Sequence, residues 1–577
     1  MSIEILQRDC RCNSMKYFIP EWDDRVDPEY DFITDNHSKI HYENPLRNDV
    51  YIWNIFGLES VPIDGVLVSR MKITENKTKY KQILNGGIHD FLRLPQSFEI
   101  MGDCGAWGYI DKEEPPFKTG EVLDYYVRSG FNYGVSIDHL IVPAHADQNE
   151  NRWTITLEKA REMYQLWSSK EEYQKSIRII GVAQGWDVGS YRKAVRELLN
   201  IGYDYIGLGG LARTPTVMKS ERDETKTLLN IIKGVWIDIN KWIDENKCKI
   251  DIHIFGVARP EIMPELMKCG VTSFDSASFL RRAWLSARNN YHAFDGKSYS
   301  AIRIPQVERS PIVKGNTNSD LKELEQKALK AVRSYDQGRV LIDEALKAIS
   351  EYDRAIGERP DLEKYYIQTL TDMPWKKCPC VICKNVGVEV AIFRGNNRNR
   401  RRGFHNTFVF FKKLREVVPR IFVFTNCAHE KDQSSRLIQA FRRYSASPVF
   451  ETFWSNVYDL PVEIGVLSTK FGLIDWSKRI PYYDYKMQES DVPKLVEELK
   501  EKLKRYDKIF FIGLGLYRDV ASRVKEETGL NIELFPKTEL TEREKLDILE
   551  YTKQMKDFRE AIISAIPEKC RPQSVSI

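Results

Sequence analysis

The sequence lacks the long hydrophobic runs of a membrane protein and the cysteine density of a small secreted one. Its 577 residues contain no apolar run of about 18 residues, and the chain does not begin with a basic segment followed by an apolar one. Ten cysteines are too few and too unevenly spread for a disulfide framework in a chain of this length. We therefore expect a cytoplasmic protein, in which clustered cysteines would bind metal.

The sequence also has little net charge. Its 87 Lys and Arg residues and 83 Asp and Glu residues leave a formal charge of +4, so any nucleic-acid surface must be a local patch. Hydrophobic residues make up 42% and aromatic residues 11%, which excludes wholesale disorder. At roughly 100 to 200 residues per domain, the length predicts two to four domains.

Strand and helix patterns alternate through the first half of the chain. Short β-branched or aromatic runs predict seven strands, at 65–69, 97–103, 131–138, 176–184, 203–210, 250–258 and 271–276. Sustained alternation with helical stretches indicates a parallel sheet, and its length fits an eight-stranded (β/α)8 TIM barrel better than an open sheet. The expected class is α/β, with an N-terminal extension at 1–60 and the barrel at 61–300.

The second half of the chain predicts three further parts. Residues 301–374 have a helical pattern without clear strands, and a metal-binding subdomain is expected at 375–412. From 413 to 577 the alternation resumes, with strands predicted at 420–426, 462–468 and 508–515. We interpret this last stretch as a separate C-terminal α/β domain.

Most of the predicted barrel strands end on a polar residue or a glycine. These ends are Asp103, Asp138, Gln184, Gly209, Gly210, Gly256 and Asp275. A single strand-end aspartate is commonly a helix N-cap or a turn residue. Three acids and a glutamine at corresponding positions instead indicate a shared active site, because the carboxyl ends of barrel strands converge on one pocket.

A tight cysteine cluster predicts a metal site. The segment CPCVIC supplies Cys378, Cys380 and Cys383, and the next histidine is His405. Thiolate and imidazole ligands in a set of four favour tetrahedral zinc, and a set closed by protein side chains is typical of a structural site. An iron–sulfur cluster is the weaker alternative, because the fourth ligand is a histidine.

Seven ordered motifs resemble the tRNA-guanine transglycosylase superfamily. They are GDCGAW (102–107), SID (136–138), VAQG (182–185), GLGGLAR (207–213), GVARPE (256–261), SFDSASF (273–279) and the cluster of three cysteines and one histidine. The resemblance covers roughly residues 60 to 410. It implies a zinc-bearing (β/α) barrel that exchanges guanine for a 7-deazaguanine base.

The resemblance also implies roles for the strand-end residues. Asp275 looks like the nucleophile that forms a covalent ester at C1′, and Asp103 looks like the general acid/base for the departing and incoming purines. The implied base-binding residues are Asp138, Gln184, Gly210, Leu211 and Trp107. Trp107 would stack on the base, and the alternative for it is a core tryptophan of the barrel rim.

A basic segment follows the metal cysteines. It contains Arg394, Arg398, Arg400, Arg401 and Arg402, interspersed with asparagines. The segment resembles the DNA-acting branch of the superfamily, which inserts 7-cyano-7-deazaguanine (preQ0) into DNA. Guanidinium groups suit phosphate contacts, although a run of arginines is also the ordinary composition of a solvated face.

Three functions remain in competition on the sequence. A DNA transglycosylase is preferred because of the arginine-rich segment and because no RNA-binding appendage is recognisable after residue 415. The alternatives are a tRNA transglycosylase and a catalytically silent nucleic-acid-binding subunit; the presence of both Asp103 and Asp275 disfavours the latter. The implied partners are DNA, a 7-deazaguanine base and helper proteins that open DNA, with a homodimer as a further expectation and no membrane.

Overall fold

The computed structural model describes residues 15–211, 221–307, 319–357, 362–537 and 548–570. The chain forms two compact units. The first comprises Met1–Glu21, Ile63–Ser276 and Leu414–Ile577, and the second comprises Trp22–Pro62 and Ala277–Lys413. No helix in the described ranges combines the length and apolar character that crossing a bilayer requires.

Eight parallel strands close into a barrel in the first unit. They are β1 (Lys16–Glu21), β2 (Gly65–Ser69), β3 (Glu99–Asp103), β4 (Tyr133–Val135), β5 (Arg178–Ala183), β6 (Tyr205–Leu208), β7 (Asp251–Ile254) and β8 (Val271–Asp275). They pair in chain order, and β1 pairs back to β8. The predicted (β/α) barrel is therefore confirmed.

The first barrel strand lies where the sequence predicted an N-terminal extension. The seven predicted strands became β2 to β8, and β1 comes from the segment KYFIPE at 16–21. The prediction that residues 1–60 form an extension outside the barrel is therefore wrong, because this range contains β1. Residues 22–62 belong to the second unit and separate β1 from β2, so the regular strand-to-helix spacing that marks the other strands is missing there.

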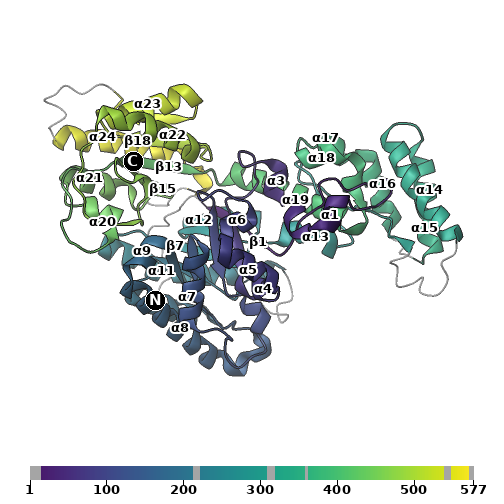
Figure 1. Cartoon of the computed structure of the whole chain (residues 1–577), viewed down its shortest axis with the longest axis horizontal. Coiled ribbons are helices and arrows are strands. Elements are labelled where there is room, and N and C mark those ends of the chain that lie inside the picture. The colour runs from purple at the N-terminus through teal and green to yellow at the C-terminus, as the bar shows by residue number, and fades with distance from the viewer. Residues whose placement is uncertain (1–14, 212–220, 308–318, 358–361, 538–547, 571–577) are drawn as a thin grey trace, which may run out of the picture. The chain divides into compact units, whose positions relative to one another are not determined.

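Large side chains fill the barrel interior. Its buried cluster contains Phe18, Leu67, Met101, Val135, Ile180, Val182 and Tyr205. The outer layer includes α7 (Thr119–Ser129), α8 (Asn149–Ser169), α10 (Val188–Ile201), α11 (Glu221–Asn246) and α12 (Met263–Lys268), most of which are labelled in Figure 1. Because the interior is packed, a site must lie beyond the strand ends, which in TIM barrels means the carboxyl face.

The second unit is mainly helical. Helices α14 (Ser319–Asp336), α15 (Ile342–Ala355) and α16 (Glu363–Asp372) occupy most of the stretch predicted to be helical. The long helix α19 (Gly395–Val417) follows the cysteine cluster. Since residues 22–62 also belong to this unit, the metal-binding part is larger than the predicted 375–412.

The C-terminal residues build a second sheet in the first unit. Its order is β16 (Gly472–Asp475), β15 (Glu463–Ser468), β13 (Ile421–Asn426), β18 (Lys508–Ile512) and β19 (Ile532–Phe535), with only β16 antiparallel. Helices α22 (Val492–Leu503) and α23 (Leu516–Thr528) pack together on this sheet, as Figure 1 shows. The α/β pattern predicted from the sequence is confirmed here, but the predicted separation is not, because Leu414–Ile577 belongs to the same compact unit as the barrel.

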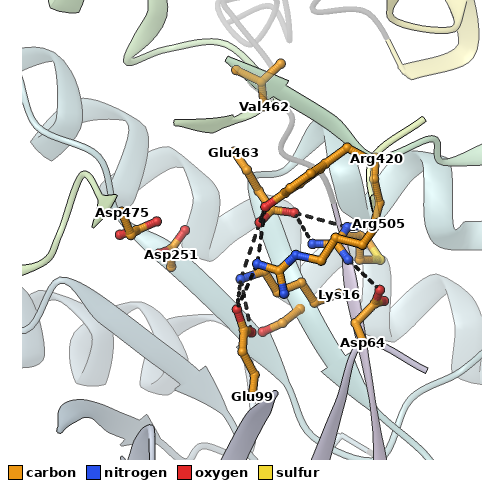
Figure 2. Close-up of polar contacts among 12 residues, drawn as sticks. Lys16, Asp64, Glu99, Asp251, Arg420, Val462, Glu463, Asp475 and Arg505 are labelled. Atoms are coloured by element: carbon orange, nitrogen blue, oxygen red, sulfur yellow. Dashed lines mark hydrogen bonds and ion pairs between the residues drawn. The ribbon is translucent and has the colours of Figure 1, made fainter. Parts of the chain in front are cut away.

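Charged side chains join this C-terminal sheet to the amino ends of the barrel strands (Figure 2). Lys16 Nζ lies 2.8 Å from Glu99 Oε1 and 3.4 Å from Glu463 Oε2. Arg420 donates to Glu463 Oε1 and to Asp64 Oδ1, each at 2.8 Å. Burial would lower the pKa of Lys16, but Glu463 and Glu99 raise it well above its usual value. The network therefore stays charged, and the carboxyl face of the barrel is left for the site.

Candidate active site and metal centre

Four of the predicted polar residues lie at the carboxyl face of the barrel. Asp103 and Asp275 are the last residues of β3 and β8, and Gln184 directly follows β5. Gln184 Nε2 donates to Asp138 Oδ2 at 2.7 Å. The charges of Asp138 and Asp275 both act on Asp103 and raise its pKa. The structure thus brings these four side chains together, as the strand-end pattern predicted.

The carboxyl group of Asp103 has a pKa raised to near neutrality. Burial, together with the nearby Asp138 and Asp275, raises the pKa of Asp103 to about 7, although the Gly105 N–H donates to its Oδ2 at 2.8 Å. Gly105 has φ +81°, and a Cβ there would lie 2.2 Å from Ser69 Oγ, so the turn that holds Asp103 requires glycine. A group with a pKa near neutrality can serve as both acid and base.

Asp138 and Gln184 form a polar edge that includes one unpartnered acceptor. Burial raises the pKa of Asp138 to about 6, against the hydrogen bond from Gln184. Gln184 is 1% exposed, and its Oε1 has no hydrogen-bond partner in the described part of the chain. A Cβ at Gly210 would lie only 2.7 Å from that oxygen, and Leu211 beside it is buried. A buried acceptor without a donor suits a ligand that brings one.

Asp275 is held by a buried hydrogen-bonded chain. The Gly256 N–H donates to Asp275 Oδ1 at 3.0 Å, and His253 Nε2 lies 3.1 Å from the same oxygen. His253 Nδ1 lies 2.8 Å from Ser273 Oγ, which lies 2.6 Å from the Tyr205 hydroxyl. If Tyr205 donates to Ser273 and Ser273 to His253, the imidazole donates its Nε2–H to the carboxylate. All donors in this order point toward Asp275.

His253 is the site residue that the sequence analysis missed. It is the third residue of β7 and is fully buried. Gly256, which also donates to Asp275, follows it by three residues. The available signal was a histidine inside the otherwise apolar run IDIHIFGVA. In a barrel strand whose alternate residues point inward, such a residue faces the axis below the pocket.

Trp107 lies on the turn after Asp103. It belongs to the short helix η1 (Ala106–Tyr109), and its side chain is 47% exposed, so the alternative of a core tryptophan is wrong. The Tyr109 hydroxyl in the same turn donates to the backbone oxygen of Asp138 at 2.9 Å. The turn that carries the indole is thus tied by a hydrogen bond to the segment that carries Asp138.

The predicted metal ligands form one buried cluster in the second unit. Cys378, Cys380, Cys383 and His405 each offer a ligand atom, and these atoms lie within 4.8 Å of one another. His405 Nδ1 is 3.5, 3.5 and 3.4 Å from the three sulfurs in that order. Metal–sulfur and metal–nitrogen bonds of about 2.3 and 2.0 Å at tetrahedral angles give a separation of about 3.5 Å. The cluster fits one tetrahedral ion.

Neighbouring groups orient these ligands. His405 Nε2 lies 2.7 Å from the carbonyl oxygen of His292, so the ring donates there and leaves Nδ1 as the ligand atom. The Tyr291 hydroxyl lies 3.2 Å from Cys383 Sγ, and the Tyr291 ring stacks on His405 at 4.1 Å. A hydroxyl that donates to a thiolate stabilises its charge. The cluster therefore offers four ligand atoms, and neighbouring groups hold at least two of the ligand side chains in place.

A second group of potential ligands, Asp27, His37 and His41, also lies in the second unit. His37 Nδ1 lies 3.2 Å from Asp27 Oδ2, which also accepts from the Ser38 N–H at 2.6 Å. His41 Nδ1 lies 2.7 Å from Asp49 Oδ1. Hydrogen bonds alone satisfy these groups, so the cluster needs no ion.

The arginine-rich segment is buried in the second unit. Four of its five arginines are at most 5% exposed: Arg394, Arg398, Arg401 and Arg402. Arg398 pairs with Asp35 and with Glu389, whose Oε2 lies 2.7 Å from its Nε. Arg402 donates to three backbone carbonyls. The prediction that these four arginines contact phosphates is therefore wrong, because their guanidinium groups are used inside the protein, and only Arg400 is partly exposed.

Comparison with known proteins gives one long match and several shorter ones. No family model matches the sequence. The chain is 35% identical to a DNA-guanine transglycosylase of Salmonella montevideo over 431 residues, which are 70% of this chain and 97% of that protein. It is 22% and 25% identical to the tRNA-guanine(15) transglycosylases of Nanoarchaeum equitans and Saccharolobus solfataricus, over 51% and 52% of those proteins.

Proposed function

Because this chain belongs to the guanine transglycosylases, which are pentosyltransferases, we propose that it exchanges guanine in DNA for a 7-deazaguanine base. The observation that carries the choice of DNA is the match to a DNA-guanine transglycosylase over 97% of that protein, against about half of the tRNA-acting relatives. The resemblance of the motifs makes 7-cyano-7-deazaguanine the proposed incoming base. The arginine-rich segment does not support the choice of DNA, because most of its guanidinium groups are buried.

In the proposed reaction Asp275 is the nucleophile. Its Oδ1 is held by His253 and the Gly256 N–H, so Oδ2 would form the bond to C1′ as the bond from C1′ to guanine breaks. Asp103 would give its proton to the departing guanine. It would then take a proton from the incoming base, whose nitrogen displaces Asp275 from C1′, and the enzyme returns to its starting state.

We assign His253 as a positioning residue for this carboxylate. The donation from its Nε2 would fix the orientation of Asp275 and stabilise its negative charge, both before attack and when the ester breaks. Ser273 and Tyr205 would keep the imidazole in the tautomer that donates toward Asp275.

The base would bind between the polar edge and the turn. Asp138 and Gln184 would meet the amide and amino groups of the heterocycle, which supply the donors that Gln184 Oε1 lacks. Gly210 and Leu211 would contribute backbone groups at the opposite edge. Trp107 would stack on the ring, which its exposed indole permits.

We further propose that the ion at Cys378, Cys380, Cys383 and His405 is zinc. Three thiolates and one imidazole in tetrahedral geometry favour it, and no ligand position is left open for substrate. Its contribution would be structural. It would hold the middle of α19, which carries His405, against the cysteine loop.

The test is a labelling experiment with both polymers. Purified protein would be incubated with radiolabelled guanine and either plasmid DNA or bulk tRNA. We expect label in DNA and none with the Asp275→Asn variant. Label in tRNA alone would move the enzyme to the tRNA-acting class, and label in neither polymer would contradict the proposed exchange.

A further inference from the structure

A second exposed tryptophan follows the base-binding glutamine. Trp186 lies two residues after Gln184, in the link between β5 and α10. Its backbone N–H donates to Ser190 Oγ at 2.9 Å, and the Ser190 N–H donates to Asp187 Oδ1 at 2.7 Å. A Cβ at Gly185 would lie 2.7 Å from the Tyr191 ring. The backbone of the link is therefore tightly held, at the carboxyl end of the strand that precedes Gln184.

The indole of Trp186 is not part of the core. It is 44% exposed, whereas Trp167 and Trp236 on the outer helices are each 5% exposed. Among the residues that the structure describes, no hydrogen bond or ring contact engages this indole. A rigid backbone thus holds a large apolar ring in solvent, and the fold gains little from its burial.

Its position singles it out from ordinary exposed residues. Within the described part of 63–276, the exposed large hydrophobic side chains are Trp107, Trp186 and Ile237. Ile237 lies on the outer helix α11, whereas the two indoles lie on the loops that follow β3 and β5. Strand β4, which leads to Asp138, lies between these strands in the barrel. The loops that carry the two tryptophans therefore flank the segment that carries Asp138.

We infer that Trp186 is a stacking site for a nucleobase next to the target guanine. This inference rests on the proposed function, in which the target base itself occupies the pocket beside Trp107. A base drawn out of a duplex leaves its neighbours unstacked. An exposed indole accepts any base face, and such stacking is worth about 5- to 150-fold in affinity per base. The preferred substrate would then be DNA that is single-stranded or already opened at the target.

Substitutions at Trp186 test the inference by binding and by kinetics. Trp186→Ala and Trp186→Leu should weaken binding of a single-stranded guanine-containing oligonucleotide by about 5- to 150-fold, and Trp186→Phe should keep most of the affinity. The KM for DNA should rise while kcat and the affinity for free guanine stay unchanged. Full affinity in the leucine variant would overturn the stacking role, because leucine restores apolar area without an aromatic face.

An abasic series identifies the contact on the DNA side. Removing the base on one side of the target guanine should weaken binding to the wild-type protein by a similar factor and leave binding to Trp186→Ala unchanged. Ile237→Ala is the control for loss of an exposed hydrophobic side chain and should bind as the wild type does. Equal losses in the wild type and in Trp186→Ala for every abasic position would overturn the inference.

These results separate the inference from the proposed function. If the wild-type protein labels DNA but Trp186→Ala has an unchanged KM, the stacking role alone is wrong. If the wild type labels only tRNA, or no polymer, the proposed function is wrong whatever the behaviour of Trp186.

Discussion

His253 Nε2 lies 3.1 Å from Asp275 Oδ1, inside a barrel whose interior is otherwise largely apolar. Both side chains are buried, and Ser273 stands on the far side of the imidazole. This contact occupies Oδ1 of the carboxylate, and the proposed attack on C1′ would use Oδ2.

Replacing His253 by Leu should therefore slow the reaction without weakening DNA binding. A hydrogen bond to a charged group contributes about 1.5–3 kcal/mol, so kcat should fall roughly 10- to 100-fold with an unchanged KM for DNA. His253→Gln, which keeps a donor, should recover part of the loss. Steady-state kinetics checks this, and a change confined to KM would contradict a positioning role.

Asp275→Asn should fold normally and form no covalent adduct with DNA. An amide is a poor nucleophile, and loss of an essential covalent nucleophile can cost on the order of 10⁴- to 10⁶-fold in kcat. Denaturing gels of protein mixed with labelled DNA would reveal the adduct. The exposed Asp484→Asn is the matched control and should retain full activity. Base exchange by Asp275→Asn at more than a few per cent of the wild-type rate would contradict the assignment of Asp275 as the nucleophile.

Asp103→Asn should stabilise the protein at high pH while abolishing exchange. The folded-state pKa of about 7 lies above the ordinary value of 3.8, so the folded chain keeps a proton that the unfolded chain has lost. Stability therefore falls as pH rises between these values, by up to about 4 kcal/mol. Urea unfolding should show the advantage of the variant growing between pH 5.5 and pH 8. A pH-independent difference would mean that Asp103 titrates normally.

Cys380→Ser should lose roughly one metal ion per chain and lower the stability of the second unit, since structural zinc binding is coupled to folding. Metal analysis by mass spectrometry and thermal unfolding would measure both effects. Cys248→Ser changes a buried cysteine outside the cluster and should keep the metal. A stable, active Cys380→Ser protein without metal would show that the cluster is incidental.

Arg398→Ala should destabilise the protein rather than weaken DNA binding selectively. The substitution leaves Asp35 and Glu389 buried without their partner, and breaking a buried ion pair costs about 3–5 kcal/mol. Thermal unfolding would measure the loss, with the exposed Arg339→Ala as the control. Unchanged stability together with a shallower salt dependence of DNA binding would restore the phosphate-contact interpretation.

Local patterns in the sequence predicted most of the barrel strands and selected residues that the structure brings together in both candidate sites, with the exception of His253. Strand-end residues such as Asp103 and Asp275 follow short β-branched or aromatic runs, and parallel strands bring their carboxyl ends together whatever the details of packing. Cys378, Cys380 and Cys383 are close in the chain, so their common role required no tertiary information. The motif resemblance added the order of these features along the chain.

The tertiary structure decided what depends on residues far apart in the chain. Strand β1 closes the barrel across the insertion at 22–62, which no local period reveals. Arg398 is buried in contact with Asp35, which lies 363 residues earlier in the chain and accepts a hydrogen bond from it. The sequence of an arginine run is the same whether its side chains face solvent or buried acidic residues. His253 acquires its role only when Asp275 lies beside it. Burial and pairing are properties of three-dimensional neighbours, and composition alone does not specify them.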